Sequence, residues 1–230
     1  MTATFPTRRV LELACAAQRT NKDYLKDIQS VYDNEGKFLF VKHPNKSLIR
    51  WALGIDRASG MSPEFAPQDI FIEDCDKEQA EEIQKYFRRL MFSAIKGDNE
   101  FQTEVNQLLS AEEIPANKIG YMASLPWVWQ KDITRNRVDK ALKLAESGFL
   151  ADEGTWIFDK DAEILKCDRS KNFDAYNILA IIDNKIASWM GSKSVKIGPA
   201  VIVKAKIKQH GNHWLTKQDE TRLNYVKVAQ

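Results

Sequence analysis

The stretch YNILAIIDNKIASWM, at residues 176–190, decides the fold of the C-terminal part of the chain. Two apolar runs, residues 176–182 and 185–190, flank the pair Asp183 and Asn184. Apolar runs on either side of a two-residue turn signal are typical of antiparallel strands joined by a tight turn. The stretch therefore predicts a β-hairpin with Asp183 and Asn184 at its tip.

Strand signals continue on both sides of this hairpin. Residues 155–159 and 163–167 are short strand-like runs before it, and residues 195–209 and 221–228 follow it. The order of these signals is that of an OB-like barrel: a strand pair with a bend, a hairpin, a gap and two further strands. We therefore predict a five-stranded OB-like antiparallel β-barrel. The longest run alternates like a half-buried strand, with Val201, Val203, Ala205 and Ile207 on one face and Lys204, Lys206 and Lys208 on the other.

The chain before this β-region carries the 3.6-residue spacing of amphipathic helices. The strongest signal covers residues 77–96, with Asp76 as its N-cap. After Gly148 the spacing of apolar residues changes from 3.6 to 2. We therefore predict an α+β protein, with a mainly helical domain at 1–150 and an OB-like β domain at 151–230. The other predicted helices cover residues 10–17, 45–54, 101–109 and 135–147, and a strand-like run covers residues 36–42.

The composition excludes several classes of protein. The chain has 230 residues, of which 43% are hydrophobic and 29% charged, so it can form a core and is not intrinsically disordered. Its net charge is +2, from 34 basic and 32 acidic residues. The charge is uneven, because residues 185–230 hold nine Lys or Arg and two acidic residues. This region has a net charge of +7, which leaves −5 on residues 1–184.

A basic β-region on an acidic body indicates a partner that carries phosphates. Single-stranded nucleic acid requires cations along its backbone and flat rings that stack on its bases. We therefore predict a non-enzymatic protein that binds single-stranded nucleic acid. The alternative is that the lysines are only the solvated side of a strand and the rings only core. The predicted phosphate contacts are Lys185, Lys204, Lys206, Lys208 and Arg222, and the predicted stacking residues are Tyr176 and Trp189.

Two runs near the C-terminus carry a resemblance to a known family. Residues 201–211 read VIVKAKIKQHG, and Gln218 is followed by TRLNYVKV at residues 221–228. Together with the hairpin they resemble the C-terminal module of small bacteriophage DNA-associated proteins. The resemblance implies an OB-like fold, single-stranded DNA rather than RNA as the partner, and an accessory role in phage replication or recombination, in the host cytoplasm. The family often has Tyr-x-Gly where residues 212–217 of this chain read NHWLTK, and many members carry a zinc ribbon that is absent here.

Residues 117–129 form the most unusual segment of the helical part. The segment is apolar, contains Trp127 and Trp129, and is interrupted by Pro126. We favour the interpretation that it is a buried connector between the domains. The alternative is a docking surface for a host or viral protein, because Trp, Tyr and Met are enriched in interface cores. In that case Trp127 and Trp129 would contact the partner.

A magnesium-dependent nuclease is a third hypothesis. Asp183 and Lys185 form an Asp-x-Lys pattern after an apolar strand, with Asp168 and Asp174 upstream. Nucleases can use two carboxylates to hold Mg²⁺ and a lysine to position water. A hairpin turn explains Asp183 and Asn184 more simply, so we assign no catalytic residue, metal ligand or cofactor.

The cysteines and the apolar segments indicate the compartment. Cys15, Cys75 and Cys167 are few and far apart, which is typical of reduced thiols rather than of a disulfide framework. No stretch approaches the roughly 18 apolar residues of a membrane-spanning helix. The sequence therefore predicts a soluble cytoplasmic protein without a membrane partner.

Overall fold

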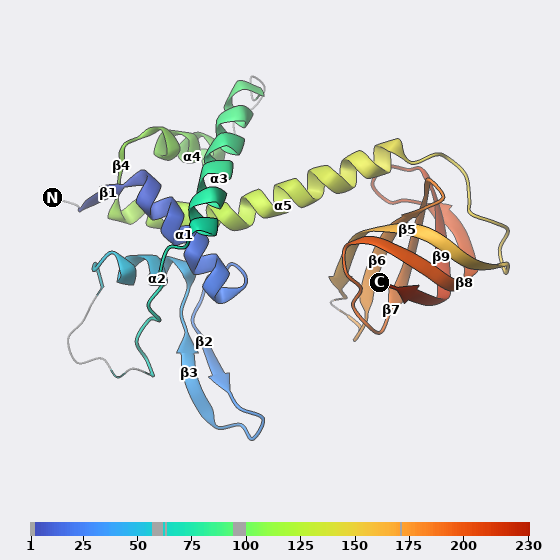
Figure 1. Ribbon diagram of the computed structural model, residues 1–230, viewed down its shortest axis with the longest axis horizontal. Coiled ribbons are helices and arrows are strands. Elements are labelled where there is room, and N and C mark those ends of the chain that lie inside the picture. Colours follow the sequence, from blue (N-terminus) through green and yellow to red (C-terminus); the bar gives the residue numbers. More distant parts are fainter. Residues whose placement is uncertain (1–2, 57–61, 63, 94–99, 171) are drawn as a thin grey trace. The chain divides into compact units, whose positions relative to one another are not determined.

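The chain forms two compact units. The first spans Met1–Asp132 and the second Ile133–Gln230. Helices dominate the first unit, and the second contains a closed β-barrel (Figure 1). The predicted α+β class is therefore confirmed. The structure, a computed structural model, describes residues 3–56, 62, 64–93, 100–170 and 172–230.

The helical unit is built around α1 (Thr7–Asn21), which is buried along most of its length. Val10, Ala14 and Ala17 have no exposed surface. The predicted helices in this unit are confirmed, although residues 94–96 lie outside the described residues. The other elements are α2 (Asn45–Ala52), α3 (Asp74–Ser93), α4 (Glu100–Ser110), the 3-10 turn η1 (Ala116–Lys118) and α5 (Ile119–Leu144). Their buried side chains form one core with α1, including Leu48, Ile49, Ile83, Phe87, Val105, Leu109, Ile119 and Met122.

Two small antiparallel pairs complete this unit. β1 (Thr4–Pro6) pairs with β4 (Glu113–Pro115), and β2 (Gln29–Tyr32) pairs with β3 (Phe38–Lys42). The β2–β3 hairpin projects away from the helices of its unit (Figure 1). The strand-like run at residues 36–42 is confirmed as β3. The strands β1, β2 and β4 are too short to show the two-residue period that would predict them.

The segment around Pro126 is helical, which corrects the sequence analysis. α5 begins at Ile119 and continues through Pro126 to Leu144, so the helix predicted from residue 135 starts much earlier. Proline lacks the amide hydrogen that a helix interior needs and usually breaks or kinks a helix. Here the burial of Met122, Ala123 and Leu125 in the core stabilises the helix on the N-terminal side of the proline. Tertiary packing thus overrides the local signal.

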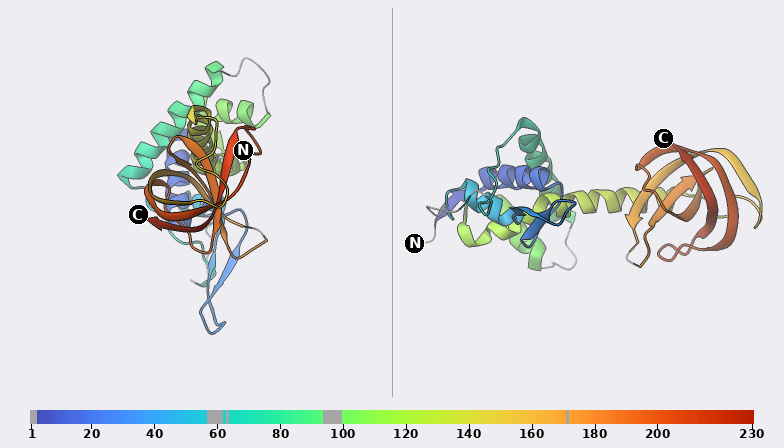
Figure 2. Two further views of the ribbon diagram at one scale, coloured as in Figure 1. Left: turned by 90° about the vertical axis from the view of Figure 1, so that its right-hand side faces the viewer. Right: turned by 90° about the horizontal axis from the view of Figure 1, so that it is seen from below.

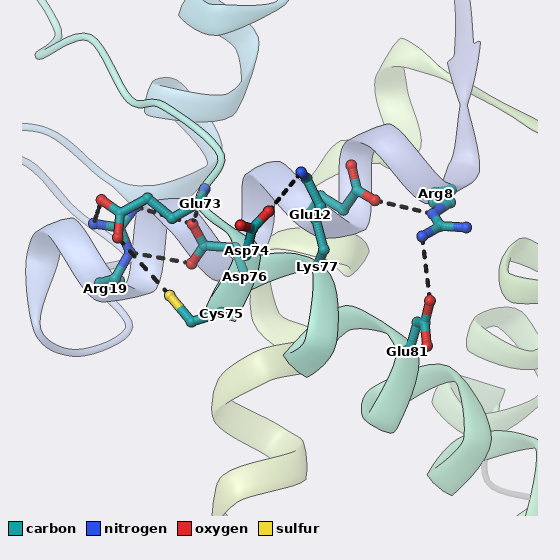
Figure 3. A network of polar contacts seen from close by, with 9 residues as sticks. All are labelled: Arg8, Glu12, Arg19, Glu73, Asp74, Cys75, Asp76, Lys77 and Glu81. Carbon is teal, nitrogen blue, oxygen red and sulfur yellow. Dashed lines mark hydrogen bonds and ion pairs between the residues drawn. The ribbon is translucent and has the colours of Figure 1, made fainter.

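Two arginines of α1 connect this helix to α3 (Figure 3). Arg8 donates from Nη2 to Glu81 Oε1 at 3.2 Å, at a site open to solvent. Arg19 donates from Nη2 to Asp76 Oδ2 at 2.9 Å and pairs through Nη1 with Glu73 Oε1 at 2.7 Å. The Asp76 carboxylate is buried and also accepts the Glu73 N–H at 2.9 Å. Asp76 therefore lies inside the first turn of α3 rather than just before it, and joins the two helices.

The second unit contains a barrel of five strands, each predicted from the sequence. The two runs at residues 155–159 and 163–167 form one long strand, and the hairpin at 176–190 forms as predicted. Asp183 and Asn184 have φ angles of 45° and 59°, as a tight hairpin turn requires. The strands are β5 (Trp156–Arg169), β6 (Tyr176–Ile182), β7 (Lys185–Gly191), β8 (Gly198–Asn212) and β9 (Asp219–Ala229).

The barrel closes in the order β5-β6-β7-β9-β8. β7 and β9 run parallel, from the pair Ile186↔Glu220 to the pair Ser188↔Arg222, and every other pair is antiparallel. The prediction of a purely antiparallel barrel is corrected on this point. Direction cannot alternate around a closed ring with an odd number of strands, so one neighbouring pair must be parallel. The strand order, with a parallel third and fifth strand, is compatible with an OB-like fold.

A bulge in β8 changes which side chains face the barrel core. The register shifts between Ile202 and Lys204. Ile202 is buried, whereas Val201 and Val203 are 36% and 39% exposed. The predicted inward face is therefore right for Ala205 and Ile207 and wrong for the two valines, because an extra residue reverses the alternation. The bulge leaves the three lysines of this strand on the outer surface: Lys204, Lys206 and Lys208.

The last turns of α5 belong to the barrel unit. Leu142 is buried against Leu165 of β5 and Ile186 of β7. Arg137 of the same helix donates from Nη2 to the Leu165 carbonyl at 3.3 Å. The division between the units consequently falls after Asp132 rather than at residue 150.

Candidate nucleic-acid interface

Figure 2 shows the barrel from two further sides. Residues of β7 and β9 line a cleft in its wall. The parallel pairing of these strands ends at Ser188↔Arg222. Beyond this pair, Met190 of β7 and Asn224 of β9 both line a cavity of about 480 Å³. We call this cavity the β7–β9 cleft. The loop between β8 and β9 contributes Trp214 to its lining.

Three basic side chains line the β7–β9 cleft, and two of them have no acidic partner among the residues that the structure describes. Lys166 pairs with Asp168 at 2.5 Å. Lys208 and Arg222 are both exposed, and within the described residues neither forms an ion pair. Arg222 is paired in register with Gln209, the neighbour of Lys208, so the two cations lie on adjacent strands. The structure thus brings together two of the predicted phosphate-binding residues.

Trp214 supplies an exposed ring at the cleft and was not among the predicted site residues. Its side chain is 75% exposed. The loop that carries it is ordered by His213, which is buried and whose Nδ1 lies 3.2 Å from Thr216 Oγ1. The His213 N–H donates to the Gln218 carbonyl at 2.8 Å, which closes the loop. Trp214 stands in the sequence between two strands, where no periodicity indicates its exposure, and only its residue type could have suggested it.

The two predicted stacking residues are placed differently. Trp189 is only 7% exposed and belongs to the barrel core, where it pairs with Ile178. Trp189 also lines the β7–β9 cleft, but its ring is largely covered by its neighbours in the core. Tyr176 is half-buried, packs against the same core and lies opposite Gly191. Neither ring matches the exposed platform expected from the sequence.

The ammonium group of Lys185 is bound to the backbone of the protein itself. Its Nζ donates to the Phe149 carbonyl at 2.8 Å, and the residue is half-buried. This contact connects β7 to the segment that follows α5. The prediction that Lys185 contacts phosphate is therefore not supported, since its ammonium group already has a backbone partner.

Lys204 and Lys206 lie on the outer face of the barrel and do not line the cleft. Their Nζ atoms are 4.2 Å and 5.9 Å from the centroid of the Trp156 ring. Both are cation–π contacts, which hold an ammonium group beside an aromatic face. These two lysines therefore lie outside the lining of the cleft, on the same strand as Lys208.

The predicted docking residues Trp127 and Trp129 are half-buried in α5. The centroid of the Trp127 ring lies 5.7 Å from that of the Tyr24 ring. Lys131 Nζ lies 3.8 Å from the centroid of the Trp127 ring. Trp129 packs against the helical core. Part of each indole is therefore engaged within its own unit, and docking of a partner on these residues stays a prediction.

The structure does not assemble the residues of the nuclease hypothesis. Asp183 pairs with Lys160 at 2.6 Å in the hairpin turn, and Lys185 is bound to Phe149. Asp168 lies opposite Asn177, at the other end of the β5–β6 ladder. Asp168 and Asp183 therefore lie near opposite ends of β6, about 20 Å apart at the usual rise of about 3.3 Å per strand residue. Among the described residues, no three metal-ligating side chains come close enough to hold an ion.

Comparisons with known proteins do not add a relative. No protein-family model, curated protein or solved structure matches the chain. In the part of the chain that the structure describes, no helix has the length and apolar character needed to span a membrane.

Proposed function

We propose that this protein binds single-stranded DNA in the β7–β9 cleft and does so without catalysing a reaction. The observation that carries the proposal is the meeting of two cations, Lys208 and Arg222, with the exposed indole of Trp214 around one cleft, where neither cation forms an ion pair with any described residue. Cations neutralise phosphates, and a flat ring stacks on a base. This combination favours a ligand that offers both groups along one chain.

The same arrangement favours a single strand over a duplex. In a duplex each base already stacks on its neighbours, so its faces are closed to a protein side chain. Trp214 can therefore stack only on a base that is free, such as one in a single strand. Lys208 and Arg222 contribute equally to binding any phosphate backbone and supply affinity rather than this preference.

Titration of a labelled oligonucleotide over a series of salt concentrations tests the proposal. For a single strand, the logarithm of the binding constant should fall linearly with the logarithm of salt, with a slope of about −0.7 for each phosphate contacted. Fluorescence anisotropy with the free strand and with its duplex measures both affinities. Absence of binding at low salt, an affinity that salt does not change, or equal affinity for the duplex would overturn the proposal.

Replacing Trp214 with alanine should weaken oligonucleotide binding without changing the fold. Loss of one base–ring contact removes about 1–3 kcal/mol of binding free energy, and the 75% exposed side chain contributes little to the core. Trp214→Phe keeps a ring and should retain most of the affinity. Leu215→Ala is the matched control, since Leu215 is exposed in the same loop but does not line the cleft. An equal loss from the Trp214 and Leu215 substitutions would argue against stacking.

The role in phage replication or recombination that the resemblance implies stays a prediction. So does the cytoplasmic location.

A further inference from the structure

The outer face of β5, β8 and β9 carries exposed rings between lysines. Trp156, Phe158 and Tyr225 are 39%, 55% and 73% exposed. The strand register places Trp156 opposite Lys206 and Phe158 opposite Lys204, which in turn lies opposite Lys227. We call this surface the aromatic–lysine face, formed by Trp156, Phe158, Lys204, Lys206, Tyr225 and Lys227.

The three rings of this face lie close to one another, and lysine ammonium groups lie beside them. The Trp156 centroid is 6.5 Å from that of Phe158 and 5.9 Å from that of Tyr225. The ammonium groups of Lys204 and Lys206 lie beside Trp156. Across the described parts of the chain, none of the three lysines forms an ion pair with a carboxylate. Rings and unneutralised positive charge therefore share one surface.

The backbone of Tyr225 is strained in a way that displays its ring. Its φ angle is 54°, in the left-handed region that bulky residues avoid. The strain arises at a bulge, where β9 inserts an extra residue between Asn224 and Lys227. Glycine is the usual residue in such a position, yet here a tyrosine occupies it and directs its side chain to solvent beside Trp156. Strain of this kind is typical of functional sites.

A row of lysines connects this face to the β7–β9 cleft. Lys204, Lys206 and Lys208 all point outward from β8, and Lys208 lines the cleft. Residues two apart along a strand are about 6.5 Å apart. One extended anionic chain can therefore follow the row from the cleft to the rings.

We propose that the aromatic–lysine face is a second segment of the binding site for single-stranded nucleic acid, continuous with the β7–β9 cleft. This inference rests on the proposed function of the cleft. The combination of rings and lysines on this face indicates which kind of ligand it binds. An apolar protein surface would bury the lysines without partners, and an acidic peptide would leave the rings without flat groups to stack on. A nucleotide chain has both phosphates and planar bases.

Oligonucleotides of two lengths separate the two segments. OB-like domains cover about 4–16 nucleotides, so a strand of about 6 nucleotides should reach only the cleft and one of about 14 should cover both segments. Tyr225→Gly is the main variant, because glycine removes the ring and relieves the left-handed backbone. We expect this variant to bind the long strand about tenfold more weakly and the short strand as the wild-type protein does. Its melting temperature should equal or exceed that of the wild-type protein.

Tyr225→Phe is the matched control, since it keeps the ring and should bind both strands normally. Wild-type affinity of Tyr225→Gly for the long strand would overturn the inference while leaving the proposed function intact. Equally, a poly-glutamate peptide that displaces the long strand from the wild-type protein, but not from Tyr225→Gly, would show that the face binds acidic protein and would overturn it. Failure of the wild-type protein to bind either strand would overturn the proposed function and this inference together.

Discussion

The double variant Lys208→Glu/Arg222→Glu is expected to bind a single-stranded oligonucleotide about 100-fold more weakly than the wild-type protein at low salt. Both side chains are exposed at the β7–β9 cleft, and among the described residues neither has an acidic partner. The substitution therefore turns attraction into repulsion at the position of the phosphates. The salt dependence should also become less steep, by about 1.4 in the slope, because two phosphate contacts are lost.

The matched control is Lys193→Glu/Lys196→Glu. It changes the net charge of the same unit by the same amount, but both lysines are exposed in the segment between β7 and β8 and do not line the cleft. We expect this control to lose no more than about threefold in affinity, since screening weakens the effect of distant charges. Anisotropy titrations compare the two variants after circular dichroism has shown that both are folded. Equal losses would mean that the barrel binds through its overall charge and not through the cleft.

The strands of the barrel could be predicted from the sequence because their signals are local. Asp183 and Asn184 adopt the positive φ angles of a hairpin turn, and the apolar runs on both sides form β6 and β7. The parallel pairing of β7 with β9 could not be predicted in this way. It follows from closure of the ring, which depends on where strands distant in sequence meet. The cleft lies where that pairing ends, so its position could not be predicted from local sequence signals either.

The candidate site was predicted in part, for a similar reason. Alternation along β8 correctly placed Lys208 on the outer surface, and Arg222 is exposed on β9. Lys185 also has the pattern of a solvent-facing residue, but its ammonium group is bound to the Phe149 carbonyl. Trp189 has a large aromatic ring, but this ring faces the barrel core, as does the side chain of its cross-strand partner Ile178. Residue type and period indicate what a side chain can do, whereas tertiary contacts decide whether it is available.

Arg19→Ala is expected to destabilise the helical unit by about 2–3 kcal/mol. Asp76 is 1% exposed, and its carboxylate accepts bonds from Arg19 Nε at 3.1 Å and Nη2 at 2.9 Å. Removing the arginine leaves a buried carboxylate without its countercharge, which commonly costs about 3–5 kcal/mol. We reduce this figure because Arg19 itself is 38% exposed, so water can reach part of the site left empty. Urea unfolding followed by helical circular dichroism measures the change.

Glu81→Gln tests the contribution of burial in this comparison. Glu81 lies on α3 and pairs with Arg8 of α1, but the two side chains are 52% and 68% exposed (Figure 3). This variant removes an ion pair between the same two helices and leaves in place the bond from Arg8 Nε to the mostly buried Glu12 carboxylate. Exposed pairs contribute little to stability, so Glu81→Gln should destabilise the unit far less than Arg19→Ala. Equal losses from the two variants would mean that burial of the Asp76 carboxylate is not what makes the pair with Arg19 important.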